Sequence, residues 1–174
     1  MANTELLEQY RVNRLVAEPK FIKLVNNPFL FSLFLLGKLP TGFMVGIKVK
    51  QADANTCKIT VPYRWLNKNP FRSTYFGVLS MAAEISTGIP ALLATYEAKP
   101  SISMLVTHVE SDFTKKATGL TTFTCTQGKL ITEAVEQAIL TGEGQKAEVL
   151  TIGTSQTDEE EARFRFTWSF KARS

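Results

Sequence analysis

The sequence predicts an α+β domain in which a mostly antiparallel sheet of about six strands wraps around one long helix. Residues 73–96 have the length and composition of a helix but carry a single charged side chain, Glu84. A helix that is apolar nearly all round lies inside a protein. Two runs with strand-like alternation precede this helix and four follow it, and a sheet needs such an element to cover its apolar face.

Helices are expected before the sheet. Residues 6–16 form a modest amphipathic pattern, which Pro19 should end. Residues 20–36 predict one or two further helical segments with a break near Pro28. The part from 28 to 36 is too short to span a bilayer, but its apolar density requires a large partner. That partner is a sheet or another subunit or, as the alternative, a membrane surface.

The expected strands are bounded by turn residues, and the first two form a hairpin. They cover residues 44–50, 56–61, 101–113, 120–127, 147–154 and 161–171, with a short amphipathic helix at residues 130–140. No repeat or linker divides the chain. We therefore expect one domain, in which residues 1–41 are a helical extension and residues 42–174 are the core.

Composition narrows the classes of function. The formal charge of +4 comes from scattered lysine and arginine pairs, which indicate solvated faces or contacts to an anionic ligand rather than a nucleic-acid surface. Cys57 and Cys125 are expected to be buried thiols. A single histidine, His108, excludes a site built from several histidines, and we expect no bound metal. No secretory signal opens the chain, so a cytoplasmic location is expected.

The central helix contains the most informative residues. Gly77, Ser80, Glu84 and Gly88 recur every three or four positions and share one small and polar stripe. A carboxyl group on an otherwise apolar helix must be solvated by a cleft, hydrogen-bonded by neighbours or held protonated. Glu84 is therefore a candidate site residue.

The segment that leads into this helix carries a family resemblance. Residues 69–77 are NPFRSTYFG, and Glu84 follows Tyr75 nine positions later. Over residues 42–171 this order resembles the hotdog fold and, within it, acyl-CoA thioesterases of the phenylacetyl-CoA type. Those enzymes have an Asn a few residues before a Gly-Thr-x-His-Gly-Gly turn, and an Asp or Glu nine positions after the His. The chain matches this pattern at Asn69, Gly77 and Glu84, has Ser73 for Thr, and departs from it at Arg72, Tyr75 and Phe76.

The resemblance implies hydrolysis of an acyl-CoA thioester, with coenzyme A as part of the substrate and no other cofactor. Glu84 would be the general base or nucleophile, Asn69 would orient the carbonyl or water, and the amides of Phe76 and Gly77 would stabilise the oxyanion. Hotdog subunits pair edge to edge, so each site would combine the helix start of one chain with the carboxylate of another. A homodimer or a dimer of dimers is therefore expected.

The remaining candidates have less specific roles. Lys115 and Lys116 could contact the phosphates of coenzyme A. Ser73 and Thr74 could contact the substrate, although capping of the helix is the preferred interpretation for both. Tyr75 is interpreted as a core or pocket aromatic residue. The lost histidine favours an alternative function, in which the protein binds an acyl chain or another apolar ligand without hydrolysis.

Overall fold

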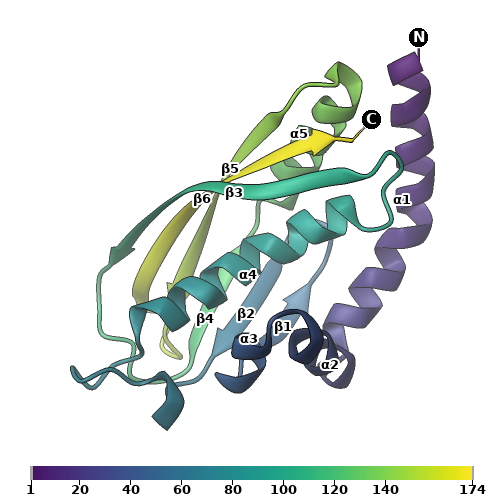
Figure 1. Cartoon of the computed structure of the whole chain (residues 1–174). Coiled ribbons are helices and arrows are strands. Elements are labelled where there is room, and N and C mark those ends of the chain that lie inside the picture. Colours follow the sequence, from purple (N-terminus) through teal and green to yellow (C-terminus); the bar gives the residue numbers. More distant parts are fainter. Residues whose placement is uncertain (1, 174) are drawn as a thin grey trace.

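A single helix, α4 (Phe76–Thr95), lies along one face of a twisted six-stranded antiparallel sheet (Figure 1). This computed structural model describes residues 2–173. The strand order is β1-β2-β4-β5-β6-β3, so β1 and β3 are the two edges. The predicted α+β architecture, with one long helix against a mostly antiparallel sheet, is confirmed.

The strands agree with the predicted ones except at the start of the first. They are β1 (Lys48–Ala52), β2 (Cys57–Val61), β3 (Ile102–Phe113), β4 (Thr121–Cys125), β5 (Gln145–Thr154) and β6 (Glu160–Ala172). The prediction of a strand from residue 44 is wrong, because a short helix, α3 (Pro40–Met44), precedes β1. Pro40 suits this helix, since proline is favoured in the first turn.

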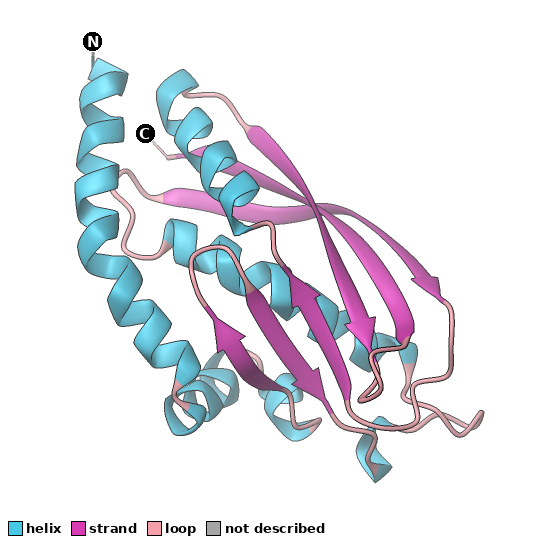
Figure 2. Cartoon of the chain, turned by 180° about the vertical axis from the view of Figure 1, so that it is seen from behind, coloured by secondary structure: helices cyan, strands magenta, loops and turns pink. Residues whose placement is uncertain are grey.

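The N-terminal helix α1 (Ala2–Asn26) continues through Pro19, so the prediction that Pro19 ends it is wrong. Proline inside a helix costs about 3 kcal/mol, and here tertiary packing outweighs that cost. The helix buries Tyr10, Phe21 and Val25 and runs beside α5 (Gly128–Thr141), as Figure 2 shows.

The predicted break near Pro28 is confirmed. The Asn27 side chain caps α2 (Pro28–Lys38) by accepting hydrogen bonds from the amides of Phe29, at 3.0 Å, and Leu30, at 3.1 Å. Proline follows the cap as the first helical residue, where its missing N–H has no intrahelical partner to lose. The sequence therefore sets this helix start locally.

The core lies between the sheet and the helices that pack against it, and includes residues of α1, α2, α4 and α5. The alternation predicted for the last strand holds, because Phe164, Phe166, Trp168 and Phe170 are all buried. By length and composition α4 is the one helix among residues 2–173 that could cross a membrane, but in this fold it is mostly buried as the core helix. The two cysteines are buried and free, as expected, and they face each other across β2 and β4.

Candidate functional site along the central helix

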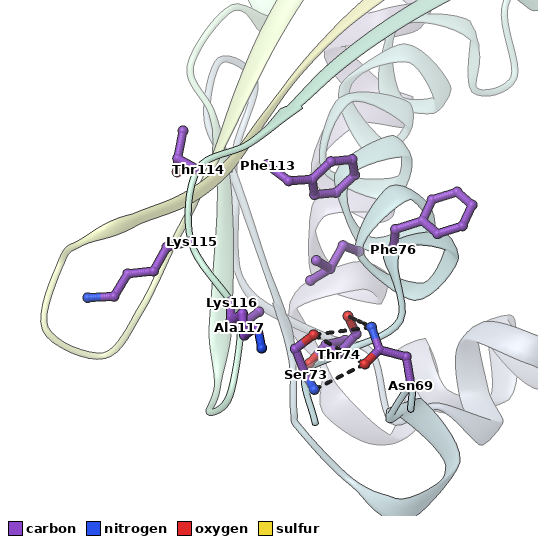
Figure 3. Close-up of a pocket in the computed structure, with 10 residues that line it drawn as sticks. Asn69, Ser73, Thr74, Phe76, Phe113, Thr114, Lys115, Lys116 and Ala117 are labelled. Atoms are coloured by element: carbon purple, nitrogen blue, oxygen red, sulfur yellow. Dashed lines mark hydrogen bonds between the residues drawn. The ribbon is translucent and has the colours of Figure 1, made fainter. Parts of the chain in front are cut away.

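A cavity of about 330 Å³ opens at the start of α4. We call it the helix-start cavity. The loop before α4, the first turns of α4 and the end of β3 with the turn that follows it form its walls, as Figure 3 shows. Its lining consists of Asn69, Ser73, Thr74, Phe76, Leu79, Phe113, Thr114, Lys115, Lys116 and Ala117. It thus brings together six of the nine residues singled out from the sequence.

The side chain of Asn69 organises the loop. Its Oδ1 accepts a hydrogen bond from the amide of Ser73, at 3.2 Å, and its Nδ2 donates to Ser73 Oγ at 3.1 Å (Figure 3). The same Oδ1 also accepts from the amide of Phe71, at 3.0 Å. Arg72, in the same loop, has φ +60°, a left-handed conformation that glycine adopts most readily. In the Gly-Thr-x-His-Gly-Gly turn that this segment resembles, the first glycine stands at this position.

The amides of Phe76 and Gly77, the first two of α4, have no acceptor within residues 2–173. The N-cap is Tyr75 and makes no side-chain capping bond, so the prediction that Ser73 or Thr74 caps the helix is wrong. Ser73 is held by Asn69, and the Thr74 amide donates to the Ala117 carbonyl at 2.8 Å. The N–H groups of Phe76 and Gly77 therefore remain free at the positive end of the helix dipole.

Aromatic rings surround this helix start. A Cβ added at Gly77 would lie 2.6 Å from Cε1 of Tyr75, so only glycine allows the ring to lie over this backbone. The rings of Tyr75 and Phe76 are 4.7 Å apart, and the ring of Phe113 is 6.4 Å from that of Phe76. All three rings are exposed in the single chain. An apolar rim therefore borders the free amides.

The two lysines differ in their surroundings. Lys115 Nζ forms an ion pair with Glu159 Oε2 at 2.6 Å, and in Figure 3 its side chain points away from the cavity. Lys116 Nζ donates to the carbonyl oxygen of Phe71 at 3.3 Å and has no carboxylate partner within residues 2–173. Lys116 is therefore the lysine whose charge is available to an anionic ligand.

Glu84 lies in a second cavity, of about 310 Å³, which we call the Glu84 cavity. Its carboxyl has no hydrogen-bond or ion-pair partner among the described residues. Burial raises the pKa of Glu84 above its ordinary value. Gly88 keeps space beside this side chain, because a Cβ there would lie 3.3 Å from Glu84 Oε1. Apart from Glu84 and Lys38, the lining is apolar: Phe31, Phe34, Leu35, Leu39, Ile85, Gly88, Ile89, Leu92, Met104 and Trp168.

Two features of the structure were not predicted. The inner face of α2, with Phe31 and Leu35, forms a wall of the Glu84 cavity. Its apolar density was visible in the sequence, but the element it covers was not. The second concerns Glu161, the first residue of the last predicted strand, which is buried in β6 and accepts a hydrogen bond from Thr121 at 2.7 Å. Burial raises its pKa, which the Thr121 bond and the Lys115 charge partly oppose.

The two cavities share no lining residue. Gly77 and Glu84 are separated by seven positions of α4, roughly 11 Å along a helix that rises 1.5 Å per residue. One reacting atom cannot contact both groups of the same chain. Within a single chain the helix-start amides and the Glu84 carboxyl therefore belong to separate cavities.

Comparison with known proteins places the chain in a family. Residues 28–170 match the family described as Domain of unknown function (DUF4442), and the chain belongs to that family. No curated protein sequence matches the chain significantly.

Solved structures with this fold include hotdog thioesterase-like proteins. One is a Pseudomonas aeruginosa protein of unknown function described as a "Probable Thioesterase", with 16% identity and TM-score 0.71 over 86% of this chain and 99% of that one. Another is a Haemophilus influenzae thioesterase, with 14% identity and TM-score 0.58 over 80% and 88%. A third is the Escherichia coli PaaI protein from the phenylacetic acid degradation operon, with 14% identity and TM-score 0.60 over 87% and 96%. At these identities the likeness shows the fold alone.

Proposed function

We propose that the protein hydrolyses acyl thioesters of coenzyme A at sites shared between two copies of the chain. The single observation that carries this proposal is the division of the catalytic groups. Free amides and an unpaired lysine line one cavity, and a carboxyl without a partner lines another. Similarity in fold to thioesterases supports the choice of substrate class.

In the proposed reaction, Glu84 of one chain accepts a proton from water while the water oxygen attacks the thioester carbonyl carbon. The amides of Phe76 and Gly77 of the other chain donate hydrogen bonds to the oxyanion that forms. Collapse of this intermediate breaks the C–S bond, and the coenzyme A thiolate takes up a proton, so the products are a carboxylic acid and a thiol. The raised pKa of Glu84 suits this role, because it makes the carboxylate a stronger base.

The exposed edge of the sheet offers a surface for the pairing of two chains. Within residues 2–173 strand β3 pairs only with β6, and its apolar residues Leu105, Val109 and Phe113 are exposed. An apolar edge strand is prone to pair with another strand. Pairing there would bury the aromatic rim at the start of α4, since Phe113 contacts Phe76 at that end.

The first test separates hydrolysis from ligand storage. The purified protein is incubated with short-, medium- and long-chain acyl-CoAs, and thiol release and ligand binding are measured on the same samples. We expect thiol release with at least one chain length. Binding without release would overturn the proposal and favour the acyl-binding alternative. Two observations support that alternative: Tyr75 stands where the resembled enzymes have His, and Asn69 Oδ1 already accepts hydrogen bonds from the amides of Phe71 and Ser73.

A matched pair of lysine variants tests where coenzyme A lies. Lys116→Ala should raise KM for acyl-CoA by about tenfold with little change in kcat, because a lost charge contact to phosphate costs about 1–2 kcal/mol. Lys115→Ala should change KM much less, since Glu159 already neutralises that ammonium group. Steady-state kinetics at low ionic strength measures both. Equal effects of the two changes would contradict the assignment to Lys116.

A further inference from the structure

The outward face of α2 is apolar along its whole length. Phe29, Leu33 and Leu36, spaced four and three residues apart, are each at least half exposed, while Phe31 and Leu35 on the opposite face are buried. The one charged residue of α2 is Lys38, at its last position. An ordinary surface helix has charged and polar residues on its outer face. This face therefore lacks the composition expected for contact with water.

Two nearby elements also expose apolar side chains. Phe43 and Met44 of α3 are exposed, and so is Trp65 of the short helix η1 (Trp65–Asn67), at 76%. Asn67 Nδ2 donates to the Val45 carbonyl at 2.9 Å, which joins η1 to the end of α3. Figures 1 and 2 both place α2 and α3 at the lower end of the molecule. We call Phe29, Leu33, Leu36, Phe43, Met44 and Trp65 the apolar end patch.

The part of the sequence that contains this patch is strongly basic. Between residues 19 and 83 the chain has nine lysines and arginines and one acidic residue, Asp53, whereas the rest has eleven basic and fifteen acidic residues. Lys38, Arg64 and Lys68 are exposed next to the patch, and none forms an ion pair within residues 2–173. In the described part of the chain, Lys20 is the one member of the nine with a carboxylate within 4.0 Å, that of Glu97.

We propose that the apolar end patch docks on the surface of an anionic lipid bilayer. Phenylalanine, leucine and tryptophan side chains bind at the boundary between head groups and acyl chains, and lysine and arginine beside them attract anionic lipids. A second copy of the chain is a poor partner. A symmetric contact would place the same positive charges opposite one another.

The first test uses the unmodified chain. Sedimentation with vesicles of phosphatidylcholine containing about one third phosphatidylglycerol should recover at least ten times more protein than with phosphatidylcholine alone, and high salt should reverse binding. Because Trp168 is buried, the fluorescence change on adding vesicles reports Trp65. Its emission should move to shorter wavelength. No thioester is present, so the result is independent of hydrolysis.

Matched variants test the position of the contact. Leu33→Asp should weaken binding to the anionic vesicles at least tenfold, whereas Leu15→Asp, at an exposed leucine of α1 outside the patch, should not. Lys38→Glu combined with Lys68→Glu should weaken binding similarly. Lys146→Glu combined with Lys171→Glu changes the net charge equally, on other elements, and should have a smaller effect. Circular dichroism verifies the fold of each variant.

Three results would overturn the proposal. The first is the absence of sedimentation and of a Trp65 emission shift with anionic vesicles. The second is equal loss of binding in the patch variants and their controls. The third is a wild type that forms an oligomer and does not bind vesicles, while Leu33→Asp lowers its particle mass. This result would assign the patch to contact between copies of the chain.

Discussion

Replacing Phe76 by proline should lower kcat for acyl-CoA hydrolysis by about 10²–10³-fold and leave the fold intact, because it removes one proposed oxyanion donor. Phe76 is the first residue of α4, where proline is well tolerated. Tyr75 before it has φ −62° and ψ 133°, an extended conformation that suits a residue preceding proline. The substitution therefore deletes an N–H that makes no hydrogen bond within the described part of the chain.

The control for this change is Phe76→Ala. Alanine also removes the exposed ring but keeps the backbone N–H, so we expect kcat within a few-fold of the wild type. Thermal unfolding of both variants shows whether the helix start is preserved. If proline and alanine reduce kcat equally, the ring rather than the amide is responsible, and the oxyanion role of this N–H is wrong.

Replacing Glu84 by glutamine should abolish turnover, with kcat lowered by about 10²–10⁴-fold, as loss of a general base does. The same change should stabilise the fold at neutral pH. Burial raises the pKa of Glu84 in the folded chain, so the free energy of unfolding falls as the pH rises from the unfolded pKa through the folded one. Glutamine has no such penalty. The difference in stability should disappear in acid, where Glu84 is protonated in both states.

A mixed dimer of the two inactive variants should recover activity. If each site combines the helix start of one chain with the carboxylate of the other, a dimer of one Phe76→Pro and one Glu84→Gln chain has one intact site. Such a dimer, purified through two different tags, should show about half the wild-type rate. Activity no higher than that of either parent would show that the proposed shared site does not exist.

The stability of Glu84→Gln has its own contradicting outcome. Loss of stability in Glu84→Gln at neutral pH would contradict the assignment of an unpartnered carboxyl.

Much of the architecture could be predicted because its signals are local. The core helix was visible from its lack of charge, the last strand from its alternating aromatic residues, and the start of α2 from Asn27 and Pro28. Predictions failed where distant packing or a loop network dominated. Pro19 lies inside a helix that packs on α5, and Asn69 holds Ser73 away from the capping position.

By itself, the sequence determined that one apolar helix would form the core and that Glu84 would be its single charge, because hydrophobic periodicity is a property of neighbouring residues. Only the tertiary structure decided which segments form the two cavities along that helix. Ala117 and Phe113 meet the start of α4, and α2 closes over Glu84, through contacts between residues far apart in the chain. Such contacts depend on how the sheet twists around the helix, which no local pattern specifies.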